Sequence, residues 1–353
     1  MRIAFGTDAG VGPHGKGAAQ LGCLVEDGMP AAAALQSATL IAAELLGIDA
    51  GALEKGKLAD VIAVPGNPLL DITVTGHVRF VMKGGKVVKN GEPLPAPKKL
   101  ALKAARLFDA EKGELVTPGL VVIEGEKIGS VRGAVPADAT VIDLGDATLL
   151  PGLIDAHVHL TGESQDDFAK AFVESVLKFP AEQTLEARLY AQRTLLGGIT
   201  TVRNLGASDL TDFGLKRAIE LGFAEGPRLL VSENPIGSRG GHADGAPAPP
   251  THLATRGVPE GICSGPDQCR DAVRWQLKYG ADVIQFMVSG GVLSLTDPVD
   301  VPQLTQDEAA AIVDEAHLWK KKAAAHCHGD AAAKIAIAAG VDSSCWWSRA
   351  GGW

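Results

Sequence analysis

The stretch LPGLIDAHVHL, residues 150–160, decides the fold, because an apolar run ends there in two histidines, His157 and His159. Side chains two positions apart on a β-strand point to the same side of the sheet. Two imidazoles side by side at a strand end can bind one divalent metal ion. The alternative is a pair of half-buried histidines on an ordinary strand, with no ligand between them.

The whole of residues 150–160, rather than the His-x-His core alone, resembles the first barrel strand of the amidohydrolase superfamily. The resemblance implies an α/β fold, a (β/α)8 TIM-like barrel with a small β-sandwich domain, and a site at the carboxyl ends of the strands. It extends over nearly all of residues 1–343. The best match is the imidazolonepropionase-like branch, which includes Xaa-Pro dipeptidases and related metallocarboxypeptidases.

The order of the parts is unusual. Residues 5–10, FGTDAG, resemble the end of the eighth and last barrel strand of that family, yet here they come first. Residues 1–92 resemble the C-terminal part of the family, and residues 98–342 resemble its N-terminal part. The sequence therefore predicts a circular permutation or a fusion of two gene fragments.

This order predicts the domain organisation. Residues 1–50 are expected to hold the last strand and helix of the barrel. A β-sandwich built from both parental ends is predicted over residues 51–150, with a linker rich in proline and glycine at residues 90–98. Barrel strands one to five are expected within residues 151–343. Residues 344–353 form an atypical tail that fits neither a strand nor the family and is typical of junction or out-of-frame sequence.

Hydrophobic periodicity and turn signals predict the individual elements. Helices are expected over residues 31–46, 182–196, 267–279 and 305–321. A β-hairpin is expected over residues 78–88, and further sandwich strands over 120–128 and 141–144. Besides the histidine strand, barrel strands are predicted over residues 2–7, 198–204, 228–232, 281–288 and 323–327. The sixth and seventh parental strands have no counterpart, so we expect an incomplete barrel. Its unpaired strand edges would permit a homo-oligomer.

Composition restricts the class of protein. The chain has 353 residues, of which 21% are charged, and a formal net charge of −9. It has no basic run, which argues against nucleic acid or an anionic membrane as partner. It has no apolar stretch long enough to cross a bilayer and no signal-peptide pattern. Five scattered cysteines predict reduced thiols and a cytoplasmic location.

The resemblance also implies a ligand set. Superfamily members hydrolyse amide, ester or amidine bonds with metal-activated water. His157, His159 and Asp8 match the first-strand histidines and the last-strand aspartate, and His326 matches the fifth-strand histidine. Asp8 would also move the proton as the catalytic residue. The alternatives are an ordinary turn aspartate and an ordinary loop histidine.

Gln285 departs from the family pattern. Relatives have a lysine at this position, which is carboxylated and bridges two metal ions. A carboxamide cannot be carboxylated and is a poor zinc ligand. We therefore expect one zinc ion rather than two.

Four further residues are predicted to line the substrate pocket. Arg203 ends the second strand and could receive a carboxylate, or could instead form a structural ion pair. His242 lies in a Gly-Gly-His-x-Asp loop like one that relatives place near substrate, His328 lies two positions after His326, and His14 follows Asp8. For His242 the alternative is a surface loop, and for His14 and His328 the alternative is no role in the pocket.

These features predict a metal-dependent hydrolase of C–N bonds whose small-molecule substrate is a dipeptide, an N-acyl amino acid or a cyclic amide. The alternative is a catalytically inactive permuted or truncated amidohydrolase fragment that at most binds zinc. Metal content together with dipeptide turnover separates the two.

Overall fold

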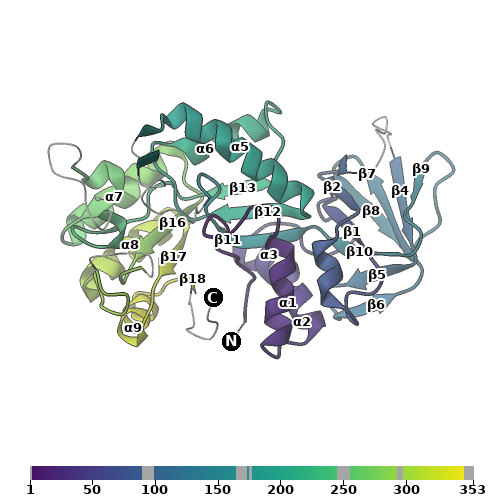
Figure 1. Ribbon diagram of the computed structural model, residues 1–353, viewed down its shortest axis with the longest axis horizontal. Coiled ribbons are helices and arrows are strands. Elements are labelled where there is room, and N and C mark those ends of the chain that lie inside the picture. Colours follow the sequence, from purple (N-terminus) through teal and green to yellow (C-terminus); the bar gives the residue numbers. More distant parts are fainter. Residues whose placement is uncertain are drawn as a thin grey trace. The chain divides into compact units, whose positions relative to one another are not determined.

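The computed structural model describes residues 2–89, 99–163, 173–174, 177–244, 255–291 and 297–345. The chain divides into two compact units (Figure 1). The first comprises residues 1–203 and 217–229, and the second comprises residues 204–216 and 230–353. The predicted linker 90–98 and most of the predicted tail, residues 346–353, lie outside the described residues.

The N-terminal segment lies beside β11 (Leu153–Val158), all of whose residues are buried. The amide of Ala156 donates to the carbonyl of Phe5 over 2.9 Å, and Ala9 forms a parallel bridge with Val158. Residues 2–8 nevertheless have no regular strand structure, so the prediction of a strand over residues 2–7 is wrong. The reason is that the ladder to β11 is too sparse to count as continuous pairing.

The predicted single helix over residues 31–46 is also wrong, because two helices occur there, α2 (Ala31–Ser37) and α3 (Leu40–Leu46). Between them, the carbonyls of Ser37 and Ala38 accept from the amides of Phe5 and Ile154 instead of from helix amides. Gly47 ends α3 in the left-handed conformation, as expected for a C-terminal glycine. The segment before α2 contributes η1 (Gly17–Gln20) and α1 (Leu21–Glu26), and η2 (Ile72–Gly76) follows further along the chain.

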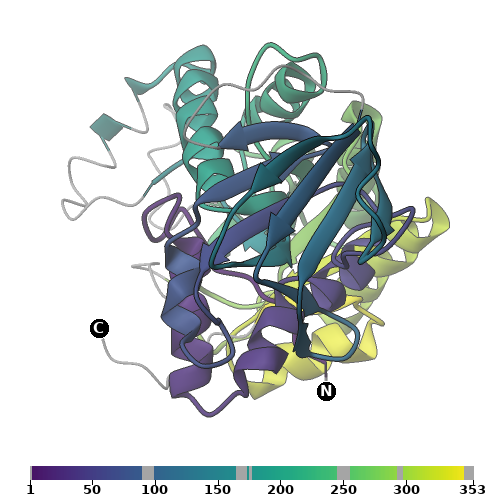
Figure 2. The same cartoon turned by 90° about the vertical axis from the view of Figure 1, so that its right-hand side faces the viewer.

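Two sheets of the first unit enclose one apolar core (Figure 2). The six-stranded sheet has the order β3 (Lys86–Lys89), β2 (Phe80–Lys83), β1 (Val61–Pro65), β10 (Ala147–Pro151), β5 (Arg106–Asp109) and β6 (Glu114–Val116). The four-stranded sheet has the order β8 (Lys127–Val131), β7 (Gly119–Glu124), β4 (Lys99–Ala104) and β9 (Thr140–Asp143). Because β1 pairs with β10, the early and late parts of this sequence share a sheet.

The predicted hairpin is confirmed by β2 and β3, which pair antiparallel. Gly84 and Gly85 turn the chain with φ values of 53° and 74°. A side chain at Gly85 would place its Cβ 1.9 Å from the carbonyl oxygen of Gly125, so only glycine fits there.

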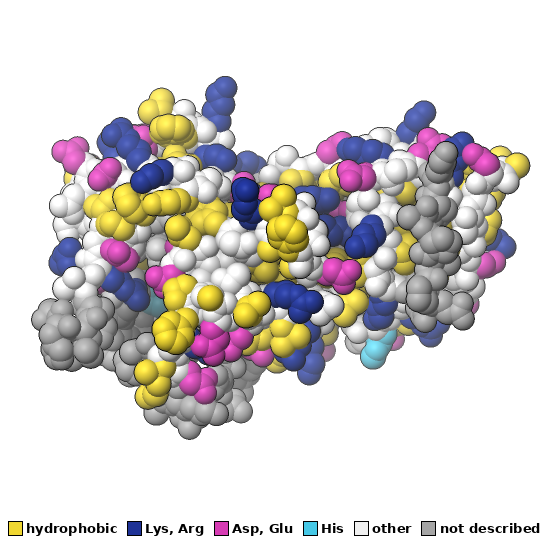
Figure 3. All heavy atoms as spheres, turned by 90° about the horizontal axis from the view of Figure 1, so that it is seen from above, with side chains coloured by type: hydrophobic (Ala, Val, Ile, Leu, Met, Phe, Trp, Pro, Cys, Tyr) yellow, Lys and Arg dark blue, Asp and Glu magenta, His cyan; other side chains and the backbone are white. Residues whose placement is uncertain are grey.

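The histidine strand β11 belongs to a three-stranded sheet with β12 (Ile199–Asn204) and β13 (Arg228–Val231). A Cβ on Gly152 would lie 2.2 Å from the hydroxyl of Thr200, so glycine permits the close approach of β12. The helices that follow β11 and β12 are α5 (Pro180–Leu196) and α6 (Thr211–Glu220), and α5 confirms the predicted helix. The face drawn in Figure 3 carries basic and acidic side chains interspersed with apolar ones.

The second unit contains the parallel sheet β16 (Val283–Met287), β17 (Lys322–His326) and β18 (Ser343–Cys345), in that order. Helices α7 (Pro266–Tyr279), α8 (Gln306–Leu318) and α9 (Asp330–Ala338) contribute to one apolar core with it. The short β14 (Gly237–Ser238) and β15 (Ile262–Cys263) pair beside η3 (His242–Asp244) and η4 (Val258–Glu260). The predicted helices 267–279 and 305–321 are confirmed, the latter with a capping box between Thr305 and Glu308.

Two predictions on this unit are wrong. Ser344 and Cys345 lie in β18, which pairs with β17, so the expected atypical tail begins with a strand. Cys263 and Cys269 form a disulfide with a Cα–Cα distance of 5.1 Å, whereas the sequence predicted reduced thiols. Their proximity depends on how β15 meets α7, which cysteine spacing alone does not reveal.

The predicted strands near residues 198–204, 228–232, 281–288 and 323–327 are confirmed as β12, β13, β16 and β17, and those near 120–128 and 141–144 as β7, β8 and β9. Barrel closure and the count of missing strands stay predictions. No helix of the described residues is long and apolar enough to cross a membrane.

Candidate metal centre

Strand alternation sets the first half of the site. On β11, Asp155 and His157 lie two positions apart, and His159 follows the strand end at the same spacing. Such residues share one face of a strand. The ring centroids of His157 and His159 are 5.2 Å apart, and their Nε2 atoms are separated by 3.3 Å. The spacing alone therefore predicted correctly that the two rings lie together.

Asp8 reaches the histidines because the chain bends at this residue. Its φ of 53° is left-handed, a conformation that aspartate tolerates better than most residues. Its amide donates to the carbonyl of His157 over 2.8 Å, and the amide of His159 donates to the carbonyl of Ala9 over 2.6 Å. These backbone hydrogen bonds hold Asp8 beside the end of β11, where its side chain can reach both histidines.

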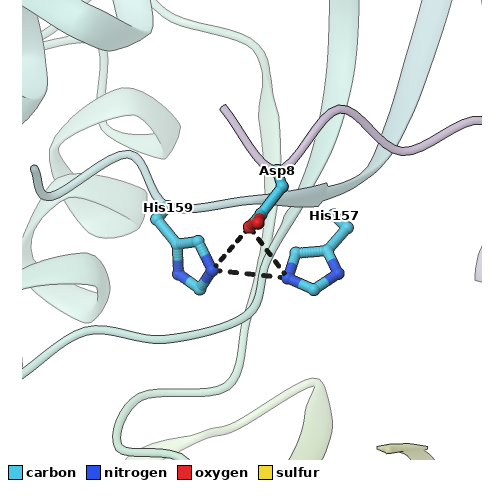
Figure 4. A group of neighbouring side chains, drawn as sticks. All are labelled: Asp8, His157 and His159. Atoms are coloured by element: carbon cyan, nitrogen blue, oxygen red, sulfur yellow. Dashed lines mark hydrogen bonds and ion pairs between the residues drawn. The ribbon is translucent and has the colours of Figure 1, made fainter. Parts of the chain in front are cut away.

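The three side chains point toward one another (Figure 4). Asp8 Oδ1 lies 3.0 Å from His159 Nε2 and 3.4 Å from His157 Nε2. All three ligand atoms fall within 4.8 Å of one another. We call Asp8, His157 and His159 the β11 site.

These distances fit a metal ion. Two donors bound tetrahedrally to one zinc at about 2.1 Å are separated by about 3.4 Å. The three separations in the β11 site, 3.0, 3.3 and 3.4 Å, are close to that value. Two imidazole nitrogens and one carboxylate oxygen also form a donor set that zinc accepts.

Burial differs across the site. His157 has a side chain that is only 9% exposed, whereas those of His159 and Asp8 are about one-third exposed, at 30% and 29%. Burial, together with the neighbouring His159, lowers the pKa of His157 to about 3. His157 is therefore neutral at physiological pH, as a metal ligand must be. Asp8 and His159 keep part of their side chains in contact with solvent.

Asp155, which was not among the residues predicted from the sequence, holds the two halves of the site together. Asp155 is fully buried. Its Oδ2 accepts from the Thr7 hydroxyl over 2.5 Å, and its Oδ1 accepts from the amides of Thr7 and His157 over 3.0 and 3.2 Å. Burial raises the pKa of Asp155 to about 7. The signal was present, because Asp155 precedes His157 by two positions on the same strand face.

His14, predicted to line the pocket, is buried at 5% exposure. Its ring stacks on Tyr190 with centroids 4.7 Å apart, and its Nε2 lies 2.8 Å from the carbonyl oxygen of Gly162. Burial lowers its pKa. His14 therefore packs in the first unit, and a contact with substrate stays a prediction.

Arg203 is also buried, and its Nε donates to the carbonyl of Ala156 over 2.7 Å. This bond ties the end of β12 to β11. A role in receiving a substrate carboxylate stays a prediction.

The remaining predicted residues lie in the second unit. The rings of His242 and His326 stack with centroids 5.2 Å apart, and those of His326 and His328 meet edge to face at 4.7 Å. We call these three the β17 histidines. The amide of His242 donates to Gln303 Oε1, and the amide of His328 donates to the Ser289 hydroxyl, each over 2.8 Å.

Gln285, the predicted substitute for a bridging lysine, lies in β16 and is 1% exposed. Its carboxamide atoms have no hydrogen-bond partner among the described residues. Because the β11 site and the β17 histidines belong to different units, His326 as a ligand of the same ion stays a prediction.

A mixed α/β fold with a candidate metal site is the class that these observations define, and the comparisons with known proteins give the family. The chain belongs to the amidohydrolase family, whose model matches residues 1–88 and 148–345.

Individual proteins resemble parts of the chain. Ochratoxinase from Aspergillus niger is 32% identical over 209 residues, which cover 55% of this chain and 42% of that protein. A crystal structure of an Xaa-Pro dipeptidase with bound methionine in the active site is 34% identical with a TM-score of 0.63, covering 70% of this chain and 61% of the other. A prolidase complexed with N-methylphosphonate-L-proline is 30% identical with a TM-score of 0.60, covering 69% and 59%. The chain thus spans less than half of the curated relative.

Proposed function

We propose that this chain is a metal-dependent hydrolase of amide or peptide C–N bonds. The observation that carries the proposal is the meeting of Asp8, His157 and His159 within 4.8 Å in a chain of the amidohydrolase family. The name of one similar structure, an Xaa-Pro dipeptidase, favours a dipeptide as substrate, and an N-acyl amino acid or a cyclic amide is proposed beside it.

One zinc ion is the proposed cofactor. His157, His159 and Asp8 would hold it, and His326 is the proposed fourth ligand. Gln285 supports one ion rather than two, because a carboxamide neither accepts carbon dioxide nor bridges metals as a carboxylated lysine does.

A bound zinc ion lowers the pKa of water and polarises a substrate carbonyl. Asp8 is proposed to take the proton of the attacking water and return it to the leaving nitrogen, because one of its oxygens meets both imidazoles while its side chain stays partly exposed. His157, neutral and buried, would hold the metal ion without exchanging protons. Asp155 would position the two segments that carry the ligands.

Four residues are proposed to bind substrate. Arg203 would contact a carboxylate, and His14, His242 and His328 would line the pocket. The burial of Arg203 and His14 and their contacts within the fold equally support a structural role, so alanine variants must be compared by KM as well as by kcat.

We also propose that the parental order is permuted. The parallel contact of residues 5–9 with β11 supports this, because the last and first strands of a closed barrel are neighbours. The pairing of β1 with β10 supports a β-sandwich made from both parental ends over residues 51–150.

A second candidate is a catalytically inactive chain that binds zinc. The substitution of the bridging position by Gln285 favours it. A homo-oligomer and a cytoplasmic location stay proposals, and the Cys263–Cys269 disulfide does not support the latter, since disulfides are rare in the cytosol.

The test measures metal content and hydrolysis on the same preparation, using Xaa-Pro dipeptides and N-acyl amino acids. We expect about one zinc per chain and hydrolysis that Asp8→Asn abolishes. Asp27→Asn, at an exposed helix end, is the matched control and should retain both. Zinc binding without turnover of any substrate would favour the second candidate.

A further inference from the structure

Two acidic side chains, Asp212 and Glu233, are buried together in the second unit, apart from the β11 site. Asp212 is 0% exposed and Glu233 is 1% exposed. Asp212 lies in the first turn of α6, and Glu233 follows β13. Neither carboxyl group takes part in an ion pair with the described residues. Two buried carboxylates without a cation would be strongly destabilising, so their protonation state must differ from the usual one.

The hydrogen bonds show where the proton is needed. Asp212 Oδ2 accepts from Asn204 Nδ2 and from the amide of Glu233, over 3.2 and 3.1 Å. Glu233 Oε1 accepts from the amide of Leu210 over 2.8 Å and from Asn234 Nδ2 over 3.1 Å. One oxygen of each carboxyl group is thereby satisfied.

The other two oxygens, Asp212 Oδ1 and Glu233 Oε2, are buried and receive no donor from the described residues. The two residues are direct neighbours, because the amide of Glu233 donates to Asp212 Oδ2 over 3.1 Å, and burial together with a hydrogen bond with the Asp212 side chain raises the pKa of Glu233. Two carboxylate oxygens can only accept, so a hydrogen bond between them requires a proton on one. A single shared proton would satisfy one carboxyl oxygen of each residue at once.

The backbone around this pair is strained. Three residues have a left-handed backbone that residues other than glycine rarely adopt. Their φ values are 57° for Asp209, 60° for Leu210 and 62° for Glu233. Such residues persist only where surrounding contacts hold them. The contacts here come from Glu233, whose carboxyl accepts from Leu210 and whose carbonyl accepts from the amide of Ala207 over 3.0 Å.

We propose that Asp212 and Glu233 share one proton at neutral pH, and that this proton fastens the turn at residues 206–211 to the residue after β13. We call this arrangement the carboxyl latch. At alkaline pH the proton passes to solvent hydroxide, two negative charges face each other, and the turn is released.

The charged groups around the latch favour this behaviour. Asp209 is a further negative charge near Glu233. Lys216, one turn along α6, is paired with Asp282 Oδ2 at 2.6 Å. Burial and the neighbouring Asp212 raise the pKa of Glu233 to about 8. A raised pKa means that the protonated form is favoured by folding, so the latch is intact at low pH and is lost as pH rises through about 8.

Hydrogen exchange of the backbone amides tests the latch in the intact chain. The amides of residues 207–211 should exchange about tenfold faster at pH 9 than at pH 7, after correction for the intrinsic pH dependence, because pH 9 is one unit above the pKa. Glu233→Gln keeps an acceptor for Leu210 and supplies a donor to Asp212. Its exchange, corrected in the same way, should not change between these two pH values.

Asp314→Asn, at an exposed position of α8, is the matched control and should behave as the wild type. Infrared difference spectra between wild type and Glu233→Gln give a second readout, in which a protonated carboxyl band should be lost between pH 7 and pH 9. That readout also serves Asp212→Asn if Glu233→Gln does not fold. A flat exchange profile in the wild type, or no carboxyl band at pH 7, would overturn the proposal. So would calcium-dependent protection, which would place a cation between the oxygens instead of a proton.

Discussion

The β11 site and the β17 histidines each bring three side chains with metal-binding atoms together, but only the first forms a compact donor set. The β11 atoms lie within 4.8 Å of one another, and no other group in the described part of the chain meets that condition. The β17 rings instead stack and meet edge to face, at centroid distances of 5.2 and 4.7 Å.

The difference has a local cause. In the β11 site, strand spacing aligns two rings, and a left-handed aspartate on a neighbouring segment supplies the third atom. Among the β17 histidines, His242 comes from a short 3-10 helix, and its ring stacks on the ring of His326. A set of suitable residue types is therefore insufficient, and the backbone must also direct their atoms to one point.

Removal of a β11 ligand should have the largest effect. His157→Ala should lower the zinc content from about one per chain to nearly none, because it removes the most buried ligand and leaves only two of the three donors of the β11 site. Metal analysis after dialysis measures this. His77→Ala, at an exposed position, is the control. Retention of zinc by His157→Ala would place the metal elsewhere.

Loss of the hydrogen bond between Thr7 and Asp155 should have the next largest effect. Thr7→Val removes the 2.5 Å hydrogen bond to Asp155 Oδ2 and leaves the buried carboxyl less satisfied. We expect zinc affinity to fall about 10- to 100-fold, as for other outer-shell changes. The free energy of unfolding should fall by about 1–3 kcal/mol. A competition titration against a zinc chelator, with the exposed Thr140→Val as reference, detects the first effect. An unchanged affinity would mean that Asp155 does not position the ligands.

The disulfide offers a change confined to the other unit. Replacing Cys263 and Cys269 by serine removes a link that closes a short loop between β15 and α7. Denaturant unfolding should show a loss of about 2 kcal/mol. Zinc content should not change, because neither cysteine belongs to the β11 site. Cys23→Ser, at an exposed free cysteine, controls for thiol chemistry. A parallel loss of zinc would show that the two regions are coupled.

The smallest effect is expected at the bridging position. Gln285→Lys could be carboxylated, but a second ion would still lack enough ligands, so the zinc content should stay near one per chain and activity should not rise to a two-metal level. Metal analysis and dipeptide hydrolysis on the purified variant check this. Two zinc ions per chain with rapid turnover would contradict this prediction and show that Gln285 alone prevents a two-metal site.

Most elements of the fold could be predicted from local sequence patterns. The His-x-His spacing, the Gly84–Gly85 turn and the capping box at Thr305 each depend on neighbours in sequence, and each prediction is confirmed for its element. Failures occurred where distant groups intervene. The helix predicted over residues 31–46 breaks because Phe5 and Ile154 bind its carbonyls.

In the candidate site, too, features set by sequence neighbours were predicted and features set by distant residues were not. Strand alternation predicted the paired rings of His157 and His159, and family resemblance supplied Asp8. The role of Asp155 depends on Thr7, which lies 148 positions away, so no local pattern could reveal that contact. The placement of His326 relative to the β11 site depends on the arrangement of the two units, which spacing does not determine.

The zinc stoichiometry of the wild-type chain tests the central claim most directly. Metal-free protein is titrated with zinc against a chelator of known affinity, and the bound metal is then counted per chain. We predict one tightly bound equivalent that is lost in His157→Ala and in His159→Ala. Two equivalents, or one equivalent that survives both substitutions, would contradict the assignment of Asp8, His157 and His159 as the metal centre.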